Sequence, residues 1–132
     1  MAELAEDVIR HLISKGVATA IGTDAFIGYL PDTDEVPPGT LAVYDTGGGP
    51  SQFAIPDLKR TMQISIRDQG YEPTRVRAWM AFNALDNPLG RVYKVNERNA
   101  LVKALQPPTV IKRDDQGRIT FVFNISIITT RD

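Results

Sequence analysis

Residues 40–86 constrain the fold of this chain more than any other segment. An apolar stretch over 40–45 predicts a strand, and a loop with three consecutive glycines, Gly47, Gly48 and Gly49, follows it. Residues 61–67 alternate between apolar and polar side chains, which is typical of an antiparallel strand with one buried face. Apolar residues then recur at helical spacing over 73–86. This order of strand, loop, strand and helix predicts an α+β fold.

The remaining segments add further elements to this unit. Helical spacing predicts an N-terminal helix over 3–15, and a short strand is expected at 24–30. Residues 52–59 are expected to be irregular, 91–95 to form a short strand, and 100–105 to form either a helical turn or a strand. The clearest alternation occupies 118–129, which is expected to pair with 109–113 across a turn. The prediction is a mixed, mainly antiparallel sheet of four to six strands packed against two main helices.

The predicted helix over 73–86 is unusual because it is apolar on two sides. One group comprises Val76, Trp79, Met80 and Ala84, and the other comprises Ala78, Ala81, Phe82 and Leu85. A surface helix normally keeps a polar outer face. We therefore expect this helix to be covered by its own sheet on one side and by a second protein surface on the other.

Composition narrows the classes of protein that this chain can represent. A length of 132 residues favours one domain spanning 1–132. The net charge of −1 argues against a dedicated binder of nucleic-acid backbones. The absence of cysteine excludes disulfides, thiolate nucleophiles and cysteine zinc sites. Without a signal peptide or an apolar run of about 20 residues, the chain is expected to be soluble and made and used in the cytoplasm.

The patterns that suggest ligand sites have simpler explanations. The glycines at 47–49 are not followed by the Gly-Lys-Ser/Thr of a phosphate-binding loop, so they predict a turn between strands or a loop that meets a partner. Carboxylates at Asp32, Asp34 and Glu35 begin a calcium-loop spacing that Val36-Pro37-Pro38 ends, which favours a solvated acidic loop.

The remaining polar candidates also have structural explanations. Asp114 and Asp115 are predicted turn formers. His11 is the only histidine, and no partner for a catalytic triad is evident, so we expect a structural role for it. The sequence therefore predicts no catalytic residue, cofactor site or metal site.

Two further groups of residues favour protein contacts. Arg60, Arg67, Arg75 and Arg77 surround the strand and helix of the central unit, where they form a solvated face or charged contacts across a subunit interface. Contact with DNA is a third option, which the absence of a net basic charge disfavours. Trp79 and Phe82 fit a core role or a role as interface anchors, with core favoured for Trp79. The candidate subunit or partner interface comprises Gly47, Gly48, Gly49, Arg75, Arg77, Trp79 and Phe82.

The chain resembles the minor capsid or tail terminator proteins of long-tailed bacteriophages, of which the lambda-type terminator is the familiar relative. The matching features are the N-terminal amphipathic helix and the segments GYLPDTDEVPPGTLAVYDTGGGPS, TMQISIRDQGYEPTRVRAWMAFNALD and DDQGRITFVFNISI. The resemblance spans nearly the whole chain and is weakest over 87–106. It implies a mixed sheet flanked by helices, a structural rather than enzymatic role, and a hexameric ring that ends polymerisation at the head-proximal end of the tail tube.

The resemblance also implies partners and a location. These are the tail tube protein, a head connector or stopper protein, and DNA that passes through the lumen without sequence-specific binding; no membrane is involved. The protein would be part of the virion, at the tail and neck, after assembly in the host cytoplasm. Two alternatives stay open at this point. One is another neck component, such as a head-completion or stopper protein, and the other is a small enzyme or ligand-binding α+β domain, which a deep polar pocket would favour.

Overall fold

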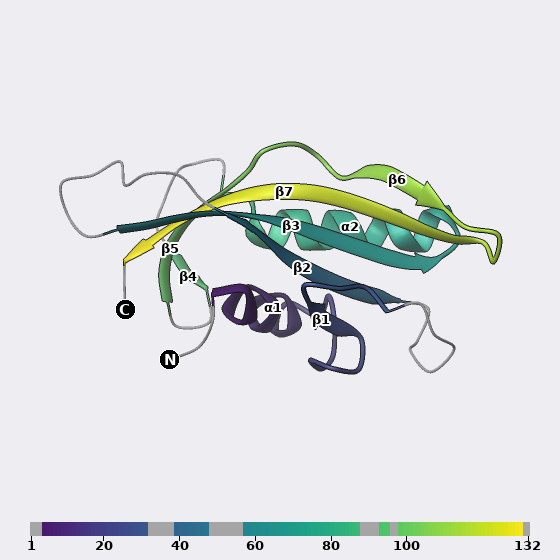
Figure 1. Cartoon of the computed structure of the whole chain (residues 1–132), viewed down its shortest axis with the longest axis horizontal. Helices are drawn as coiled ribbons and strands as arrows, with labels where there is room; N and C mark the ends of the chain where they lie inside the picture. Colours follow the sequence, from purple (N-terminus) through teal and green to yellow (C-terminus); the bar gives the residue numbers. More distant parts are fainter. Residues whose placement is uncertain (1–3, 32–38, 48–56, 88–92, 96–97, 131–132) are drawn as a thin grey trace.

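The computed structural model describes residues 4–31, 39–47, 57–87, 93–95 and 98–130. Within these ranges the chain forms, in order, α1 (Leu4–Ser14), β1 (Ala25–Ile27), β2 (Thr40–Gly47), β3 (Asp57–Gln69), α2 (Tyr71–Leu85), β4 (Tyr93–Val95), β5 (Arg98–Ala104), β6 (Thr109–Arg113) and β7 (Arg118–Thr130) (Figure 1). Neither described helix is long and apolar enough to cross a lipid bilayer.

One curved sheet contains all the described strands. Its order is β1-β2-β3-β7-β5-β4, and β6 also pairs with β7. β1 and β2 are parallel, and every other described pair is antiparallel. β3 and β7 pair without interruption from Asp57↔Thr130 to Gln69↔Arg118 and form the central ribbon of the sheet. The predicted α+β class, with a mixed and mainly antiparallel sheet and two helices, is confirmed.

The sheet has seven described strands, more than the four to six predicted, because β7 carries two different neighbours on one side. β5 pairs with its second half, from Ala104↔Ile125 to Ala100↔Thr129. β6 pairs with its first half, from Arg113↔Ile119 to Thr109↔Val122. A strand of 13 residues is long enough for both partners, and this also makes residues 98–104 a strand rather than a helical turn.

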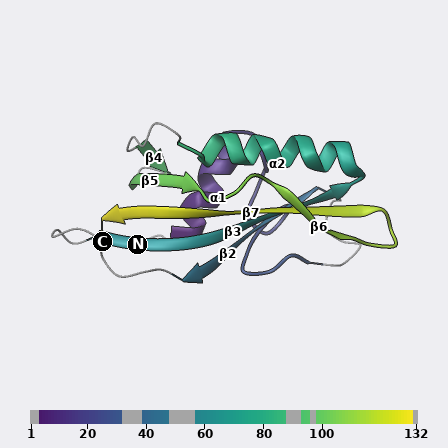
Figure 2. The ribbon, with the colours of Figure 1, turned by 90° about the horizontal axis from the view of Figure 1, so that it is seen from above.

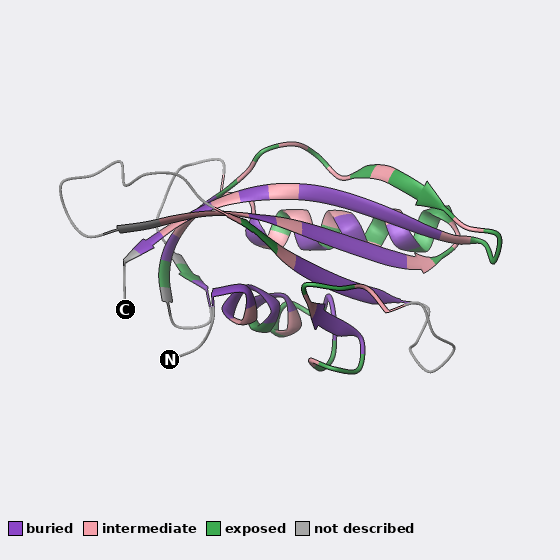
Figure 3. Ribbon diagram, in the orientation of Figure 1, coloured by how far each residue is buried: buried purple, intermediate pink, exposed green. Residues whose placement is uncertain are grey.

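Both helices cover the same face of the sheet, as the view in Figure 2 shows. The period of two residues in a strand places alternate side chains on opposite faces. The face toward the helices carries the apolar set predicted for the last strand, and all of it is buried: Ile119, Phe121, Phe123, Ile125 and Ile127. Met62, Ile64 and Ile66 of β3 lie beside them in the same core (Figure 3). We call the opposite side, which no described helix covers, the uncovered face.

Several element boundaries differ from the sequence-based expectation. Residues 52–59 were expected to be irregular, but β3 starts at Asp57. The end of this segment is a strand because its backbone pairs with the end of β7. β1 spans only Ala25–Ile27 rather than 24–30, and β2 extends to Gly47 rather than ending at residue 45. Helix α2 begins at Tyr71, two residues before the predicted start, with Pro73 in its first turn, where the missing N–H of proline costs nothing.

Specific hydrogen bonds fix the helices relative to the strands. Helix α1 ends in a motif in which Gly16 N–H donates to the Ile13 carbonyl and Val17 N–H donates to the Leu12 carbonyl, both at 3.0 Å. After α2, the carboxylate of Asp86 accepts a hydrogen bond of 3.1 Å from the Ala104 N–H at the end of β5. The end of α2 is therefore tied to the sheet.

Candidate functional site

Helix α2 contacts the sheet through a narrow stripe of mostly small residues, Thr74, Ala78, Ala81 and Leu85, all buried. On the side away from the sheet, Val76 and Met80 are 48% and 43% exposed. Small residues bring the helix close to the sheet, and the larger apolar residues point outward. The predicted second apolar side of this helix therefore exists, and nothing in the described part of the protomer covers Val76 and Met80.

A groove of about 400 Å³ follows this outward side of α2, and we call it the α2 groove. Its lining consists of Asp68, Glu72, Pro73, Val76, Arg77 and Met80. The Arg75 guanidinium donates from Nε and Nη2 to the two carboxylate oxygens of Glu72 at 2.9 and 3.0 Å. This hydrogen bonding lowers the pKa of the Glu72 carboxyl. The groove thus combines an apolar floor with the carboxylates of Asp68 and Glu72 and the guanidinium of Arg77 at its rim.

The four α2 residues predicted for an interface point in different directions. Arg77 lies at the groove, with Nε 3.8 Å from Asp68 Oδ2. Trp79 and Phe82 are half-buried and their ring centroids are 5.1 Å apart, while Phe82 lies 5.6 Å from the buried ring of Phe123. Phe82 therefore links α2 to the core, whereas Arg77 faces the groove.

The other predicted interface residues lie away from this helix or outside the described residues. Gly47 ends β2 and its N–H donates to Asp45 Oδ1 at 2.9 Å, but Gly48 and Gly49 lie outside the described residues, as do Asp32, Asp34 and Glu35. Arg60 forms an ion pair of 2.6 Å with Asp45. Arg67 is buried and donates to the Pro31 carbonyl. Both arginines are thus engaged within their own protomer.

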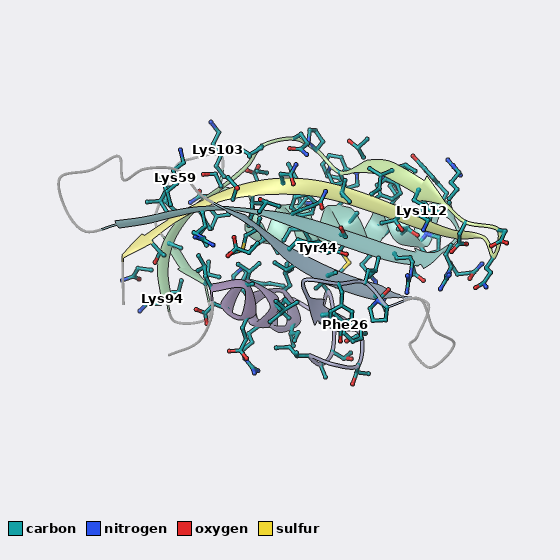
Figure 4. The ribbon with its side chains drawn as sticks, in the orientation of Figure 1. Phe26, Tyr44, Lys59, Lys94, Lys103 and Lys112 are labelled. Carbon is teal, nitrogen blue, oxygen red and sulfur yellow. The ribbon has the colours of Figure 1, made fainter. Side chains whose placement is uncertain are left out.

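The uncovered face of the sheet is polar and basic. Opposite pairs of residues in antiparallel strands point to the same side, so Gln63 lies beside Asn124 and Thr61 beside Ser126 on this face. The cations that the strand register places on this face include Lys59, Arg67, Lys103, Lys112 and Arg118. Figure 4 shows Lys59 and Lys103 near one end of the ribbon formed by β3 and β7 and Lys112 near the other.

A cavity of about 260 Å³ opens on this face next to the β6–β7 hairpin. Its lining includes Tyr44, Ser65, Arg67, Ile111, Lys112 and Thr120. Burial raises the pKa of the Tyr44 hydroxyl, and the charge of Arg67 partly offsets this effect. The cavity joins polar side chains from four strands, and Asp114 of the hairpin turn also lines it.

The turn of this hairpin agrees with the sequence-based prediction. Asp114 accepts hydrogen bonds from the backbone N–H groups of Gln116 and Arg118 at 3.0 and 2.9 Å and from Arg118 Nε at 2.7 Å. Burial opposes ionisation of Asp114, but these hydrogen bonds outweigh it and lower the pKa of the carboxyl. Asp114 is therefore a turn former, and its neighbour Asp115 is exposed in the same turn.

Strand β6 presents an exposed apolar side chain at the rim of this cavity. The register between β6 and β7 shifts between Val110 and Lys112, which leaves Ile111 without an opposite residue on β7. Ile111 is 59% exposed, the largest value among the exposed large apolar side chains of the described residues. The sequence alone did not single out Ile111, because the bulge that turns it outward interrupts the alternation of the strand.

His11 has a structural position, as expected. Its ring is buried between the two helices, and Nε2 lies 3.0 Å from the carbonyl oxygen of Ala84 at the end of α2. Burial lowers the pKa of His11, with a smaller opposing effect from the hydrogen bond to Ala84. Among the described residues, no group of three or more histidine and acidic side chains is placed to hold a metal ion.

Comparison with known proteins identifies a family that matches this chain. The family model for bacteriophage tail terminator proteins matches residues 11–131, from the middle of α1 to the end of β7. No curated protein matches the chain. Among the solved structures, 18 chains match. One of them, whose name describes no function, has a TM-score of 0.52 and 10% sequence identity and covers 98% of this chain and 99% of that chain, which supports the fold alone. Because the family model spans nearly the whole sequence, the chain belongs to the bacteriophage tail terminator protein family.

Proposed function

We propose that the protein forms a homohexameric ring at the head-proximal end of the phage tail tube. The family gives it a structural role in the tail, in contact with other virion components. In the proposed role the ring ends polymerisation of the tube protein and provides the joint to a head connector or stopper protein. The chain has no catalytic role in this proposal, and its assembly takes place in the host cytoplasm.

The observation that carries this proposal is the incomplete burial of α2. Val76 and Met80 are both more than 40% exposed and lie together over one groove rimmed by polar residues, and contiguous exposed apolar surface of this kind marks interaction sites. In a ring, each subunit contacts its two neighbours through different surfaces, so one surface of this kind is required on each side. We assign Arg77 and Trp79, which flank the exposed side of α2, to the subunit interface, with Arg75 and Phe82 as their supports.

The remaining parts of the proposal concern the partners of the ring. Gly47, at the end of β2, is assigned together with Gly48 and Gly49 to contacts with the tail tube or the connector. DNA passes through the lumen without sequence-specific binding, which fits a chain of net charge −1. The single domain of residues 1–132 is the repeating unit of the ring.

Size-exclusion chromatography with light scattering tests the ring directly. The measurement is made with the protein alone and with purified tail tube protein, because a ring can also close only on the end of the tube. The expected assembly has six times the 14.6 kDa mass of one chain. A strict monomer at every concentration, with and without tube protein, contradicts the proposal.

Deletion of the gene separates termination from another role in the neck. Without a terminator, tails become overlong and irregular in electron micrographs. Normal tails that fail to join filled heads would instead assign the protein to head completion or to a stopper. Complementation with the intact gene is the control for both outcomes.

A further inference from the structure

We infer that the subunits join head to tail, with Ile111 and Lys112 on β6 of one subunit seated in the α2 groove of the next. This inference rests on the proposed ring, and it identifies the two surfaces through which neighbouring subunits make contact. The occupant of the groove is therefore a second copy of this chain.

The two surfaces face in opposite directions. Helix α2 covers one face of the sheet, and Val76 and Met80 point away from that face. Ile111 and Lys112 line the cavity on the uncovered face, beside Ser65 and Thr120. The two surfaces thus lie on opposite sides of the same sheet. A contact between them is heterologous, and a repeated heterologous contact generates a closed ring when its rotation closes, as the proposed ring requires.

The α2 groove and Ile111 are complementary apolar surfaces. The floor of the α2 groove is formed by Pro73, Val76 and Met80. Ile111 stands out from its strand at the bulge and is 59% exposed. A branched aliphatic side chain fits an apolar groove of about 400 Å³, and burial of both partners removes exposed apolar surface from two subunits at once.

The two surfaces also carry opposite charges that can pair. The two carboxylates of the groove each have an arginine partner in their own subunit, Arg77 for Asp68 and Arg75 for Glu72. The Glu72 side chain is nevertheless 67% exposed, so a second cation can approach it beside Arg75. Lys112 follows Ile111 directly and forms no ion pair within the described part of the chain. An apolar side chain with a neighbouring cation thus faces an apolar floor with the exposed carboxylate of Glu72 beside it. Such complementarity selects the partner and fixes the register of the contact.

A charge-exchange experiment tests this pairing. Lys112→Glu and Glu72→Lys, made separately, are each expected to weaken subunit association by about tenfold or more, because each places like charges opposite one another. The double variant exchanges the charges and is expected to recover most of the association. Lys94→Glu is the matched control, because Lys94 is an exposed lysine on β4, away from β6 (Figure 4).

Cysteine cross-linking gives a second test that does not depend on the size of a charge effect. The chain has no cysteine of its own. The double variant Met80→Cys/Ile111→Cys is expected to form a ladder of disulfide-linked oligomers on mild oxidation, because each subunit then carries both halves of the contact. Each single variant is expected to stay unlinked, because a heterologous contact never brings two identical residues together. The longest product also gives the number of subunits.

The outcomes separate this inference from the proposed function. A ring that forms in the wild type but gives no ladder, and is insensitive to both charge reversals, overturns the pairing and leaves the ring intact. Cross-linking of a single variant points to an isologous dimer and overturns the head-to-tail arrangement. A wild type that stays monomeric with tube protein present overturns both. Circular dichroism of each variant identifies any loss of folding, and the cross-linking variants then decide the question.

Discussion

At the scale of single residues, His11 is the clearest case of a side chain that stabilises the fold through its neutral form. Since a carbonyl oxygen only accepts hydrogen bonds, the Nε2 atom that faces Ala84 carries the hydrogen. The ring is buried, and burial lowers its pKa below the ordinary value of 6.5. His11 therefore joins the two helices while it remains uncharged.

This position predicts that stability falls in mildly acidic solution. Below the unfolded pKa of 6.5, the unfolded chain binds a proton at His11 before the folded chain does, so the free energy of unfolding decreases as the pH falls. Above that value both states are neutral and His11 adds no pH dependence. Urea unfolding at several pH values between about 7.5 and 5 measures this effect.

The variant His11→Gln provides the comparison. Glutamine keeps an amide donor but does not titrate, so its unfolding free energy should change less over the same pH range, at a cost of about 1 kcal/mol at neutral pH. Asp114 does not interfere, because the lowered pKa of its carboxyl places its effect at more acidic pH. Equal pH slopes for the wild type and His11→Gln would contradict the role assigned to His11.

The turn between β6 and β7 gives a second prediction for single residues. Gly117 has a φ of 79°, and a Cβ at this position would lie 2.7 Å from Gln69 Nε2. Gly16 has a similar φ of 82° with nothing near its Cβ position. Both Gly→Ala variants should lose about 1–2 kcal/mol from left-handed strain. Gly117→Ala should lose more, because Gln69 also donates to the Gln116 carbonyl at 2.7 Å. Equal losses in chemical denaturation would mean that Gln69 moves away without cost.

At the scale of elements, α2 carries two different functions on two sides. Phe82 packs against Phe123 and the core, so Phe82→Ala should lower the free energy of unfolding by about 3 kcal/mol. Val76 is 48% exposed, so Val76→Ser should change monomer stability by no more than about 0.5 kcal/mol and should weaken subunit association instead. Urea unfolding at low protein concentration and light scattering at high concentration measure the two effects. Losses of equal size in monomer stability would show that both sides belong to the core.

The same elements show what the sequence predicts and where it stops. The apolar repeat in the sequence was sufficient to predict α1, α2 and β7. An element that buries one face repeats its apolar residues every 3.6 residues in a helix or every 2 residues in a strand, and this repeat is visible in the sequence. It was not sufficient for β5, whose short apolar run fits a helix or a strand equally well until β7 offers it an edge. The start of β3 at Asp57 depends in the same way on a partner that is distant in sequence.

The candidate site was predictable to a smaller extent. The outward side of α2 follows from the spacing of Val76 and Met80, because a helix places both on one side. The α2 groove also needs Asp68, which belongs to β3 and reaches the helix only through the fold. Ile111 depends on a bulge, which one strand alone does not specify. Side chains that lie within one element were thus predictable, and their combinations across elements were not.

At the scale of the whole molecule, the ribbon of β3 and β7 is the centre of the sheet. Both strands span 13 residues and pair along their full length, and α2 rests on them while α1 contacts β1, β2 and β4. The buried residues of both helices and of the sheet form one hydrophobic core. This arrangement supports the proposal that residues 1–132 are one domain.

One core predicts one cooperative unfolding transition. Trp79 is the only tryptophan and lies on α2, so its fluorescence reports the helix, while far-ultraviolet circular dichroism reports mainly the sheet and both helices together. In urea, and at a concentration low enough to keep subunits apart, the two signals should give the same midpoint and the same slope. A fluorescence change that precedes the loss of dichroism would mean that α2 detaches while the sheet persists. In that case the exposed side of α2 would reflect weak attachment to the sheet rather than a surface kept for a neighbouring subunit.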